Sequence, residues 1–521
     1  METEQLLKKV RDYIRQGVLP GVDVLHEDVD VAAVQIPKEL AVVTRDSLML
    51  LQKRHPVDWL QLDRLRAHSD RGKRAGYTEY IHYFSLPDEQ ILAPAIEQHP
   101  LTVLFSYLDG SGKHKVDDFV QHFTQRYTMI EKMLRVRPEL QNSLSISRVL
   151  KKQEREPVCI IGIVMDKSES KNGNIMLTIE DKTGTIKALV SKAKPDLFQQ
   201  ARDIVFDEVI GIDGVCGNRI VFVNNIFWPD VPYSKELKKT EEDVHAVFLS
   251  DIHVGSMYFL HKEFGRFLKW ISGQSGSDAQ RAIAQKVKYI IIAGDIIDGV
   301  GIYPGQDKEL IIQDIYQQYE ECARLLQKIP PHINIIICAG NHDALRLSEP
   351  QPPLDKDFAR AIYALPNVTV VSNPSLVTLH AHDPSGGVDV MLYHGYSFDY
   401  FVANVESIRS KGGYHRADLI MKFLLKRRHL APTLNAALRI PDTQTDPLVI
   451  SKIPDILVTG HIHYSLVGNY RNITLISGSC WQSTTEFQRK MGHTPEPGRA
   501  PVINLKTREV KILKFIDEEA A

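Results

Sequence analysis

Five short polar clusters in the C-terminal half of the chain constrain its fold more than any other feature, because each follows a run of apolar, mostly β-branched residues. Such runs are typical of strands buried in a sheet. An α/β sheet gathers its ligand-binding side chains at the carboxyl ends of its strands, so we expect the clusters to meet. They are Asp251-Ile252-His253, Gly294-Asp295, Gly340-Asn341-His342-Asp343, His394-Gly395 and Gly460-His461-Ile462-His463, and the preceding runs span 244–249, 289–293, 333–338, 388–393 and 456–459.

The residue types in these clusters suit a centre of two divalent metal ions. Two ions held about 3.5–4 Å apart need a carboxylate that bridges them, with oxygen and imidazole ligands around each ion. Asp295 is the best candidate for the bridge. Asp251 and His253 are two residues apart, so on an extended segment both side chains point the same way and can close on one ion. The predicted ligands are Asp251, His253, Asp295, Asn341, His394, His461 and His463.

His342 and Asp343 are predicted to serve the chemistry without binding metal. His342 faces the open side of the site, where it can protonate a leaving oxygen or stabilise the transition state. Asp343 can orient His342 from behind. Any one cluster alone is more often a loop fragment than a ligand set. All five in order after strands favour a metal site, and the alternative that remains is a site that is present but idle.

The five clusters together resemble those of the calcineurin-like metallophosphoesterase superfamily, especially its nucleases. Their surroundings are similar to the small subunits of archaeal family D DNA polymerases, and the resemblance is strong from about Val116 to the C-terminus. Related eukaryotic accessory subunits have lost metal ligands that this chain keeps. The segments that carry the likeness are Gly294-Asp295-Ile296-Ile297-Asp298-Gly299-Val300-Gly301-Ile302-Tyr303-Pro304-Gly305-Gln306, and Gly340-Asn341-His342-Asp343 leading to Glu349-Pro350-Gln351-Pro352.

The resemblance implies a multi-domain α/β chain with three kinds of unit. We expect a small helical N-terminal region, an oligonucleotide/oligosaccharide-binding (OB) fold and a calcineurin-like αββα sandwich. The expected ranges are 1–76 for the helical region plus a linker, 77–155 for a helical connecting segment, 156–232 for the OB fold and 243–517 for the phosphoesterase domain.

The resemblance also implies a function. The chain is expected to be a 3′→5′ exonuclease and the accessory subunit of a heterodimeric archaeal replicative polymerase, with a separate large subunit that polymerises. Two divalent ions are expected, Mn²⁺ as the first choice with Mg²⁺ as the alternative, and DNA with single-stranded or mismatched 3′ ends as substrate. Two other functions stay open: a non-catalytic scaffold of the polymerase, and a phosphoesterase acting on small molecules or proteins.

Composition agrees with a soluble, multi-domain protein. The 521 residues exceed one domain, and 43% hydrophobic and 25% charged residues are ordinary for a globular chain. No run of eighteen apolar residues exists and no signal peptide begins at Met1, so we expect a cytoplasmic protein without a membrane contact. The five cysteines form no Cys-x-x-Cys pair, which argues against a zinc ribbon or a disulfide framework.

The net charge of −2 argues against binding nucleic acid by bulk electrostatics, so any DNA contact must be local. The segment 409–429 is rich in basic residues and follows the His394 loop. It can be a solvated helix face or a surface that contacts phosphates, and its position favours the second. The candidate DNA-binding residues are Arg409, Lys411, Arg416, Lys426, Arg427 and Arg428.

The OB-like unit has the expected order of strands at 159–164, 175–179 and 185–190, a helix at 195–205, and strands at 208–212 and 219–223. Aromatic residues are nearly absent from its strands, since Phe222, Phe227 and Trp228 cluster at its end. Bases stack on aromatic side chains, so we expect this unit to dock a protein rather than a single strand.

The first 150 residues are less informative. Helical spacing of apolar residues predicts helices over 2–17, 44–53 and 116–134, and a shorter one near 144–150. A polar, glycine-containing stretch over 64–78 is typical of a linker.

Overall fold

The computed structural model describes residues 101–108, 113–491 and 494–516, together with 19–20, 42–53 and a few single residues before residue 101. Within these residues the chain is a mixed α/β protein with two six-stranded sheets and a closed five-stranded barrel. No helix among the described residues is long and apolar enough to cross a membrane.

The first sheet supplies three of the five strands that precede the polar clusters. Strands β12, β11, β10 and β9 run parallel, and β18 and β19 extend the sheet beside β9 as antiparallel neighbours. The bounds are β9 His245–Leu249, β10 Val287–Ala293, β11 Asn334–Cys338, β12 Val368–Val370, β18 Arg499–Asn504 and β19 Val510–Lys514.

The second sheet supplies the other two strands. Strands β14, β15 and β17 are parallel, whereas β13, β3 and β16 pair antiparallel with their neighbours. The order is β16-β17-β15-β14-β13-β3. The bounds are β3 Leu101–Ser106, β13 Ser375–Leu379, β14 Val388–Leu392, β15 Ile456–Thr459, β16 Leu466–Tyr470 and β17 Ile473–Ser477.

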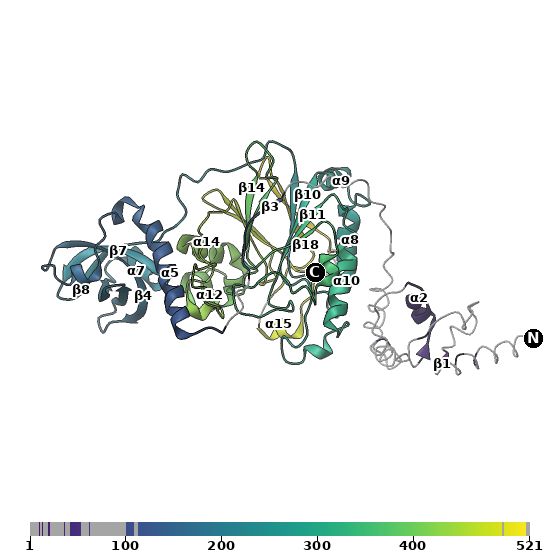
Figure 1. Cartoon of the computed structure of the whole chain (residues 1–521), viewed down its shortest axis with the longest axis horizontal. Helices are drawn as coiled ribbons and strands as arrows, with labels where there is room; N and C mark the ends of the chain where they lie inside the picture. Colours follow the sequence, from purple (N-terminus) through teal and green to yellow (C-terminus); the bar gives the residue numbers. More distant parts are fainter. Residues whose placement is uncertain are drawn as a thin grey trace, which may run out of the picture.

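The two sheets pack face to face, and helices cover their outer faces (Figure 1). Along β9, Ala246 and Phe248 join the apolar core between the sheets, while Val247 and Leu249 face the helices. This alternation explains why the run is apolar throughout, since both faces are buried. The helices of the first side are α8 His261–Ile271, α9 Asp278–Gln285, α10 Ile315–Leu326 and α11 Arg360–Tyr363, and those of the second are α12 Phe398–Asn404, α13 Glu406–Arg409 and α14 Ala417–Arg427.

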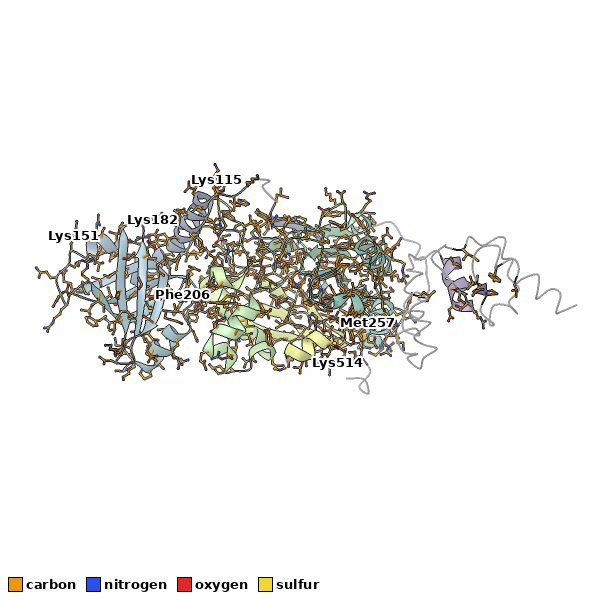
Figure 2. The ribbon with its side chains drawn as sticks, turned by 90° about the horizontal axis from the view of Figure 1, so that it is seen from below. Lys115, Lys151, Lys182, Phe206, Met257 and Lys514 are labelled. Atoms are coloured by element: carbon orange, nitrogen blue, oxygen red, sulfur yellow. The ribbon has the colours of Figure 1, made fainter. Side chains whose placement is uncertain are left out.

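The barrel lies at one end of the molecule, beyond helix α5 (Figure 1). Figure 2 marks this end by Lys151 and Lys182, and the opposite side of the two-sheet unit by Met257. The barrel closes in the order β4-β5-β6-β8-β7, with α7 between β6 and β7. Its elements are β4 Pro157–Glu169, β5 Ile175–Asp181, β6 Gly184–Val190, α7 Pro195–Arg202, β7 Val209–Gly217 and β8 Ile220–Phe227.

The strands and the helix predicted for the barrel are present, though β4, β7 and β8 run further than expected. A register shift between Val164 and Asp166 lets β4 bend and continue its pairing with β5. The remaining elements are β1 Leu19–Pro20, β2 Val42–Val43, α2 Arg45–Lys53, α5 Val116–Arg135, η2 Pro138–Leu140, α6 Ile146–Val149, η3 Gln306–Lys308, η4 Gly413–Arg416, η5 Leu434–Ala436 and α15 Glu486–Met491.

The predicted helices over 44–53 and 116–134 match α2 and α5, and the short one near 144–150 matches α6. The predicted helix over 2–17 and the linker over 64–78 lie outside the described residues, save for single positions in the helix.

Strand β3 corrects the predicted domain layout. The segment 77–155 was expected to be helical, but Leu101–Ser106 forms an edge strand that pairs with β13. The sequence LTVLFS has strong strand propensity, yet it lies more than 260 residues from its partner, so no local pattern reveals the pairing. The two-sheet unit is therefore not the continuous range 243–517, because it includes a strand that precedes the barrel.

Buried charges fix α5 against the two-sheet unit. Asp446 is fully buried, and its Oδ2 accepts hydrogen bonds from Arg126 Nε at 2.7 Å and His429 Nε2 at 2.9 Å. The Nε2 of His122 lies 3.4 Å from the same oxygen. The imidazoles and the guanidinium outweigh burial, which opposes ionisation, and hold the pKa of Asp446 well below its usual value.

Candidate metal centre

The five polar clusters meet where the two sheets adjoin. Strands β9, β10 and β11 of the first sheet end beside one another, and β14 and β15 of the second sheet end on the same side. The structure thus brings together all seven residues predicted as ligands.

One subsite is formed by Asp251, His253 and His463, whose donor atoms lie within 4.8 Å of one another. The Nε2 atoms of His253 and His463 are 3.0 Å apart. Asp251 Oδ1 lies 3.4 Å from His463 Nε2, and Asp295 Oδ2 lies 3.9 Å from His253 Nε2. Two imidazole nitrogens and two carboxylate oxygens therefore face one small space.

The second subsite shares Asp295 with the first. Its Oδ2 lies 3.3 Å from His394 Nε2. The Oδ1 of Asn341 lies 2.9 Å from both His394 Nε2 and His461 Nδ1. Asp295 thus stands between two groups of donors, as a bridging carboxylate must. Carboxylates, imidazoles and an amide oxygen form a donor set that fits two divalent ions.

The backbone of the site adopts sparsely populated conformations. Five of the seven predicted ligands have a positive φ: Asp251, His253, Asp295, His461 and His463, with values between 51° and 70°. Such conformations cost of order 1–3 kcal/mol each and cluster at functional sites. Two of the motif glycines are needed for close approach, because a Cβ on Gly340 would lie 2.2 Å from Asp295 Oδ1, and one on Gly460 would lie 2.5 Å from Asp251 Oδ2.

Each imidazole of the site has a partner for its other nitrogen, which fixes how the ring points. The Nδ1 of His394 donates to the carbonyl of Ala293 at 2.8 Å. The partners of the other rings were not predicted from the sequence. They are Asp298 Oδ1 at 3.1 Å from His253 Nδ1, Asp399 Oδ2 at 3.1 Å from His461 Nε2, and Gln488 Nε2 at 3.0 Å from His463 Nδ1.

Asp298 could have been found, since it follows Asp295 by three residues in a stretch already singled out. Its carboxylate also accepts hydrogen bonds from Gln306 and Gln482, at 3.0 and 2.8 Å. Asp399 and Gln488 carry no such signal, because they lie on α12 and α15, far along the chain from the rings they contact.

The prediction that Asp343 orients His342 is wrong. The Oδ2 of Asp343 accepts hydrogen bonds from the backbone amides of Gly340 and Asp295, at 2.8 and 3.0 Å. Asp343 therefore holds the loops after β10 and β11 in place and does not orient the imidazole of His342. The partner of His342 is the carbonyl of Asp298, to which Nδ1 donates at 2.7 Å. This bond places the proton of the neutral ring on Nδ1 and leaves Nε2 as an acceptor.

The carboxylates and imidazoles of the site shift one another's pKa values. Burial opposes ionisation of Asp295, but the neighbouring imidazoles, His394 first, outweigh it and hold the pKa of Asp295 well below its usual value. Burial likewise disfavours the charged form of His394, yet Asp295 and Asp251 outweigh it and raise the pKa of His394 to about 10. A cation that binds here must therefore displace a proton. Burial, with the charge of Asp295, raises the pKa of Asp343 to about 7.

The six candidate DNA-binding residues differ in how exposed they are in the structure. The prediction is wrong for Arg427 and Arg428, which are only 4% and 6% exposed. Arg427 forms an ion pair at 2.6 Å with Glu208 of the barrel, and Arg428 donates to the carbonyls of Ile450 and Ser451. Helix α14 carries this part of the segment, and its last turn is covered by the barrel rather than by solvent.

Of the remaining four residues, Lys426 is largely buried, with its ammonium 3.9 Å from the ring centre of Trp228. Arg416 pairs with Asp418 at 2.8 Å, and Arg409 pairs with Glu406. Arg409 and Lys411 are exposed, so they are the two candidates that solvent reaches most freely.

Comparisons with known proteins identify the family. The family model for the B subunits of DNA polymerases alpha and epsilon matches residues 246–466. The chain is 40% identical over 410 residues to the DNA polymerase II small subunit of Methanothermobacter thermautotrophicus, covering 79% of this chain and 81% of that protein. This chain belongs to the family of DNA polymerase II small subunits. It is 38% identical over 413 residues to the same subunit of Pyrococcus abyssi, covering 78% of this chain and 65% of that protein.

Membership of this family makes the chain an accessory subunit of an archaeal DNA polymerase, with a place in DNA replication. The resemblance drawn from the motifs is thus confirmed at the level of the family.

Likeness to solved structures is weak. An archaeal phosphodiesterase is 12% identical, with a TM-score of 0.25, and the match covers 52% of this chain and 99% of that one. The telomere capping protein Ten1 from Saccharomyces pombe is 23% identical, with a TM-score of 0.13, and the match covers 16% of this chain and 75% of that one. Neither score identifies a fold.

Proposed function

We propose that this subunit is itself a nuclease, a metal-dependent 3′→5′ exodeoxyribonuclease that hydrolyses DNA phosphodiesters for proofreading. The observation that carries the proposal is the pair of donor groups that share Asp295, each built from residue types that bind divalent ions. A scaffold subunit would have no need for five ligand positions with positive φ, whose cost must be met elsewhere in the fold.

The ligands of the two proposed ions, Mn²⁺ or Mg²⁺, are assigned as follows. Asp251, His253 and His463 would hold one ion, Asn341, His394 and His461 would hold the other, and Asp295, which lies beside donors of both groups, would be shared between them. Ions bound there would supply Lewis acidity towards the phosphate and would lower the pKa of a bound water molecule.

His342 is the proposed proton-handling residue. The carbonyl of Asp298 fixes its ring through Nδ1, so Nε2 is the atom that can contact a substrate oxygen. Burial lowers the pKa of His342 below its usual value. Nε2 would take a proton from solvent water and donate it to the departing 3′ oxygen, while Nδ1–H keeps its bond to the carbonyl of Asp298.

The domains are proposed to be an OB fold and a calcineurin-like phosphoesterase unit. The barrel order β4-β5-β6-β8-β7, with a helix between its third and fourth strands, supports the first assignment. Two sheets packed face to face, with helices on both outer faces and ligands at the strand ends, support the second. The second unit comprises 243–516 together with β3.

The proposed partner is the large, polymerising subunit, which would deliver unpaired or mismatched 3′ ends to the centre. Support comes from the name of the relatives, which are small subunits, and from the modest charge of this chain. The barrel offers exposed apolar side chains for docking, with Met165 49% and Phe222 48% exposed. Trp228 is buried against Lys426 and offers no stacking surface.

The test is a cleavage assay on the purified subunit and on its complex with the large chain. The substrate is a 5′-labelled DNA with an unpaired 3′ end, and Mn²⁺ is either added or removed by a chelator. We expect stepwise shortening from the 3′ end with Mn²⁺, and its loss in Asp295→Ala. The control Asp278→Ala changes a carboxylate that is 97% exposed and should cleave as the wild type does.

Three outcomes separate the rival functions. Absence of cleavage in the metal-loaded complex would leave a scaffold. Hydrolysis of phosphomonoesters, but not of DNA, would favour a small-molecule or protein phosphoesterase. Equal cleavage by Asp295→Ala and the wild type would refute the centre proposed here.

A further inference from the structure

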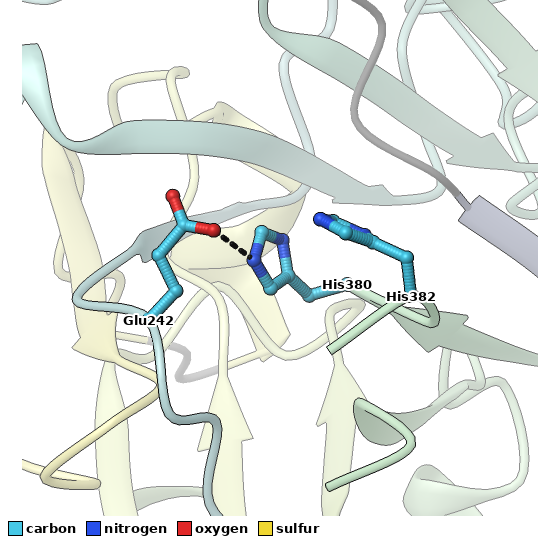
Figure 3. A group of neighbouring side chains, drawn as sticks. All are labelled: Glu242, His380 and His382. Carbon is cyan, nitrogen blue, oxygen red and sulfur yellow. Dashed lines mark hydrogen bonds and ion pairs between the residues drawn. The ribbon is translucent and has the colours of Figure 1, made fainter. Parts of the chain in front are cut away.

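A second group of metal-binding residue types lies at the opposite end of the strands from the candidate centre. His380 and His382 stand in the turn between β13 and β14, and Glu242 stands on the connector that follows the barrel (Figure 3). Strand β14 begins beside this turn and ends next to His394 of the candidate centre. One donor atom of each of the three residues lies within 4.8 Å of the other two.

We propose that Glu242, His380 and His382 bind one divalent transition metal ion of the zinc type. Two imidazole nitrogens and one carboxylate oxygen form a donor set that zinc accepts, with a water molecule in the fourth position. Magnesium and calcium prefer sets of hard oxygen donors, whereas two of the three proposed ligands here are imidazoles, which suit a zinc-type ion better.

The ring of His380 is oriented by a hydrogen-bond partner on one nitrogen, as the rings of metal-binding histidines usually are. The side chain is fully buried, and its Nδ1 lies 3.1 Å from the hydroxyl of Tyr289. The same hydroxyl accepts the backbone N–H of His380 at 3.0 Å. The other nitrogen, Nε2, faces the carboxylate of Glu242 (Figure 3). The distance from Nε2 to Glu242 Oε2 is 2.8 Å. A fixed partner on the nitrogen that does not bind metal is the usual arrangement for ligating histidines.

The connector is fastened to the turn independently of the three side chains. The carboxylate of Asp383 accepts the backbone N–H groups of Glu241 and Glu242, at 2.9 and 3.2 Å. Ser385 also donates to this carboxylate from its backbone and its hydroxyl. The backbone positions of Glu242 and of the turn are therefore set before an ion arrives, which reduces the ordering cost of binding.

Small movements suffice to accept the ion. The side chain of Glu242 is 55% exposed and His382 is exposed, so both can shift without disturbing the core. The ring of His382 lies 4.3 Å from that of His380, centre to centre, inclined by 59°. A bound ion would lie between His380 Nε2 and Glu242 Oε2 and would tie the connector after the barrel to the second sheet.

The experiment measures Zn²⁺ binding to the full chain after metal is stripped from it, by competition with a chromophoric zinc chelator. We expect His382→Ala to bind one Zn²⁺ fewer than the wild type. The matched control is His114→Ala, which removes an exposed histidine just before α5 and should bind as many ions as the wild type. This difference does not depend on how many ions the centre at Asp295 holds, because that centre is intact in all three proteins.

Two conservative variants sharpen the result. Glu242→Gln should weaken the same ion by at least tenfold, and Tyr289→Phe should weaken it by roughly 10–100-fold, the usual effect of removing the partner of a ligating histidine. Equal zinc counts in the wild type and His382→Ala would overturn the proposal, and so would an equal loss in His114→Ala.

Discussion

Arg427→Ala should destabilise the protein strongly, because it breaks an ion pair in the contact between the barrel and α14. The side chains of Arg427 and Glu208 are 4% and 1% exposed, and they lie 2.6 Å apart. Removing one partner of such a pair leaves a buried charge without compensation and costs about 3–5 kcal/mol. The guanidinium also lies 3.2 Å from the ring centre of Phe423, a contact that is lost with it.

The matched control is Arg416→Ala, on the other end of the same helix. Its side chain is 43% exposed and pairs with Asp418 at 2.8 Å. An exposed pair of this kind contributes about 0–1 kcal/mol. The two variants remove the same side chain from the same basic segment, so the difference between them reports the buried setting of Arg427, including its contact with Phe423.

The assay is urea unfolding followed by tryptophan fluorescence, to which Trp228 contributes because it lies in the contact and donates to Glu208 at 3.0 Å. The double variant Arg427→Met with Glu208→Gln should recover much of the lost stability, since it leaves no unpaired charge. A loss of stability in Arg427→Ala no larger than in Arg416→Ala would refute the reasoning. So would a variant that unfolds normally but binds DNA less tightly.

Three further predictions concern the centre and the buried network. His342→Ala should keep its Mn²⁺ content, measured by elemental analysis, yet slow cleavage by roughly 100-fold or more; loss of the metal would refute the assigned role. Asp399→Asn should weaken the ion held by His461 by roughly 10–100-fold in a Mn²⁺ titration, with little change in unfolding. Burial lowers the pKa of His429 to about 4, so its contribution to stability is complete above pH 6.5 and is lost as the pH falls towards 4. The decrease amounts to about 3 kcal/mol, and urea unfolding of His429→Gln over this range should show a correspondingly smaller pH dependence.

That the seven proposed ligand residues lie together could be predicted from the sequence, because the signal for their positions is local. Each lies directly after a buried strand, and the spacing of Asp251 with His253 and of His461 with His463 is read along a few residues. Once the two sheets pack against each other, the ends of these strands lie close together. The same reasoning explains why the barrel strands were found, since turns and alternation are also local features.

The predictions that were wrong, and the residues that were missed, depend on contacts between segments that lie far apart in the sequence. The basic residues of 409–429 were predicted to be exposed, which assumed that no other part of the chain covers the helix. Arg427 instead pairs with Glu208, which lies 219 residues earlier in the chain. Asp399 contacts His461 across 62 residues, and β3 pairs with β13 across a longer separation still. No periodicity in the sequence indicates these contacts. The side chains that orient the imidazoles, and the inclusion of β3 in the two-sheet unit, are therefore known only from the structure.

The division of the proposed ligands between the two sheets has a mechanical consequence. Asp251, His253, Asp295 and Asn341 follow strands of the first sheet, whereas His394, His461 and His463 follow strands of the second. Each subsite therefore takes donors from both sheets, and its dimensions depend on how closely the sheets pack. The layer between them consists of buried apolar side chains such as Phe248, Leu392 and Val458. Interiors of this kind are close-packed and transmit small displacements. A shift of the sheets by a fraction of an ångström changes the distances between donors on opposite sides, so metal affinity should respond to substitutions of core side chains that are not themselves proposed ligands.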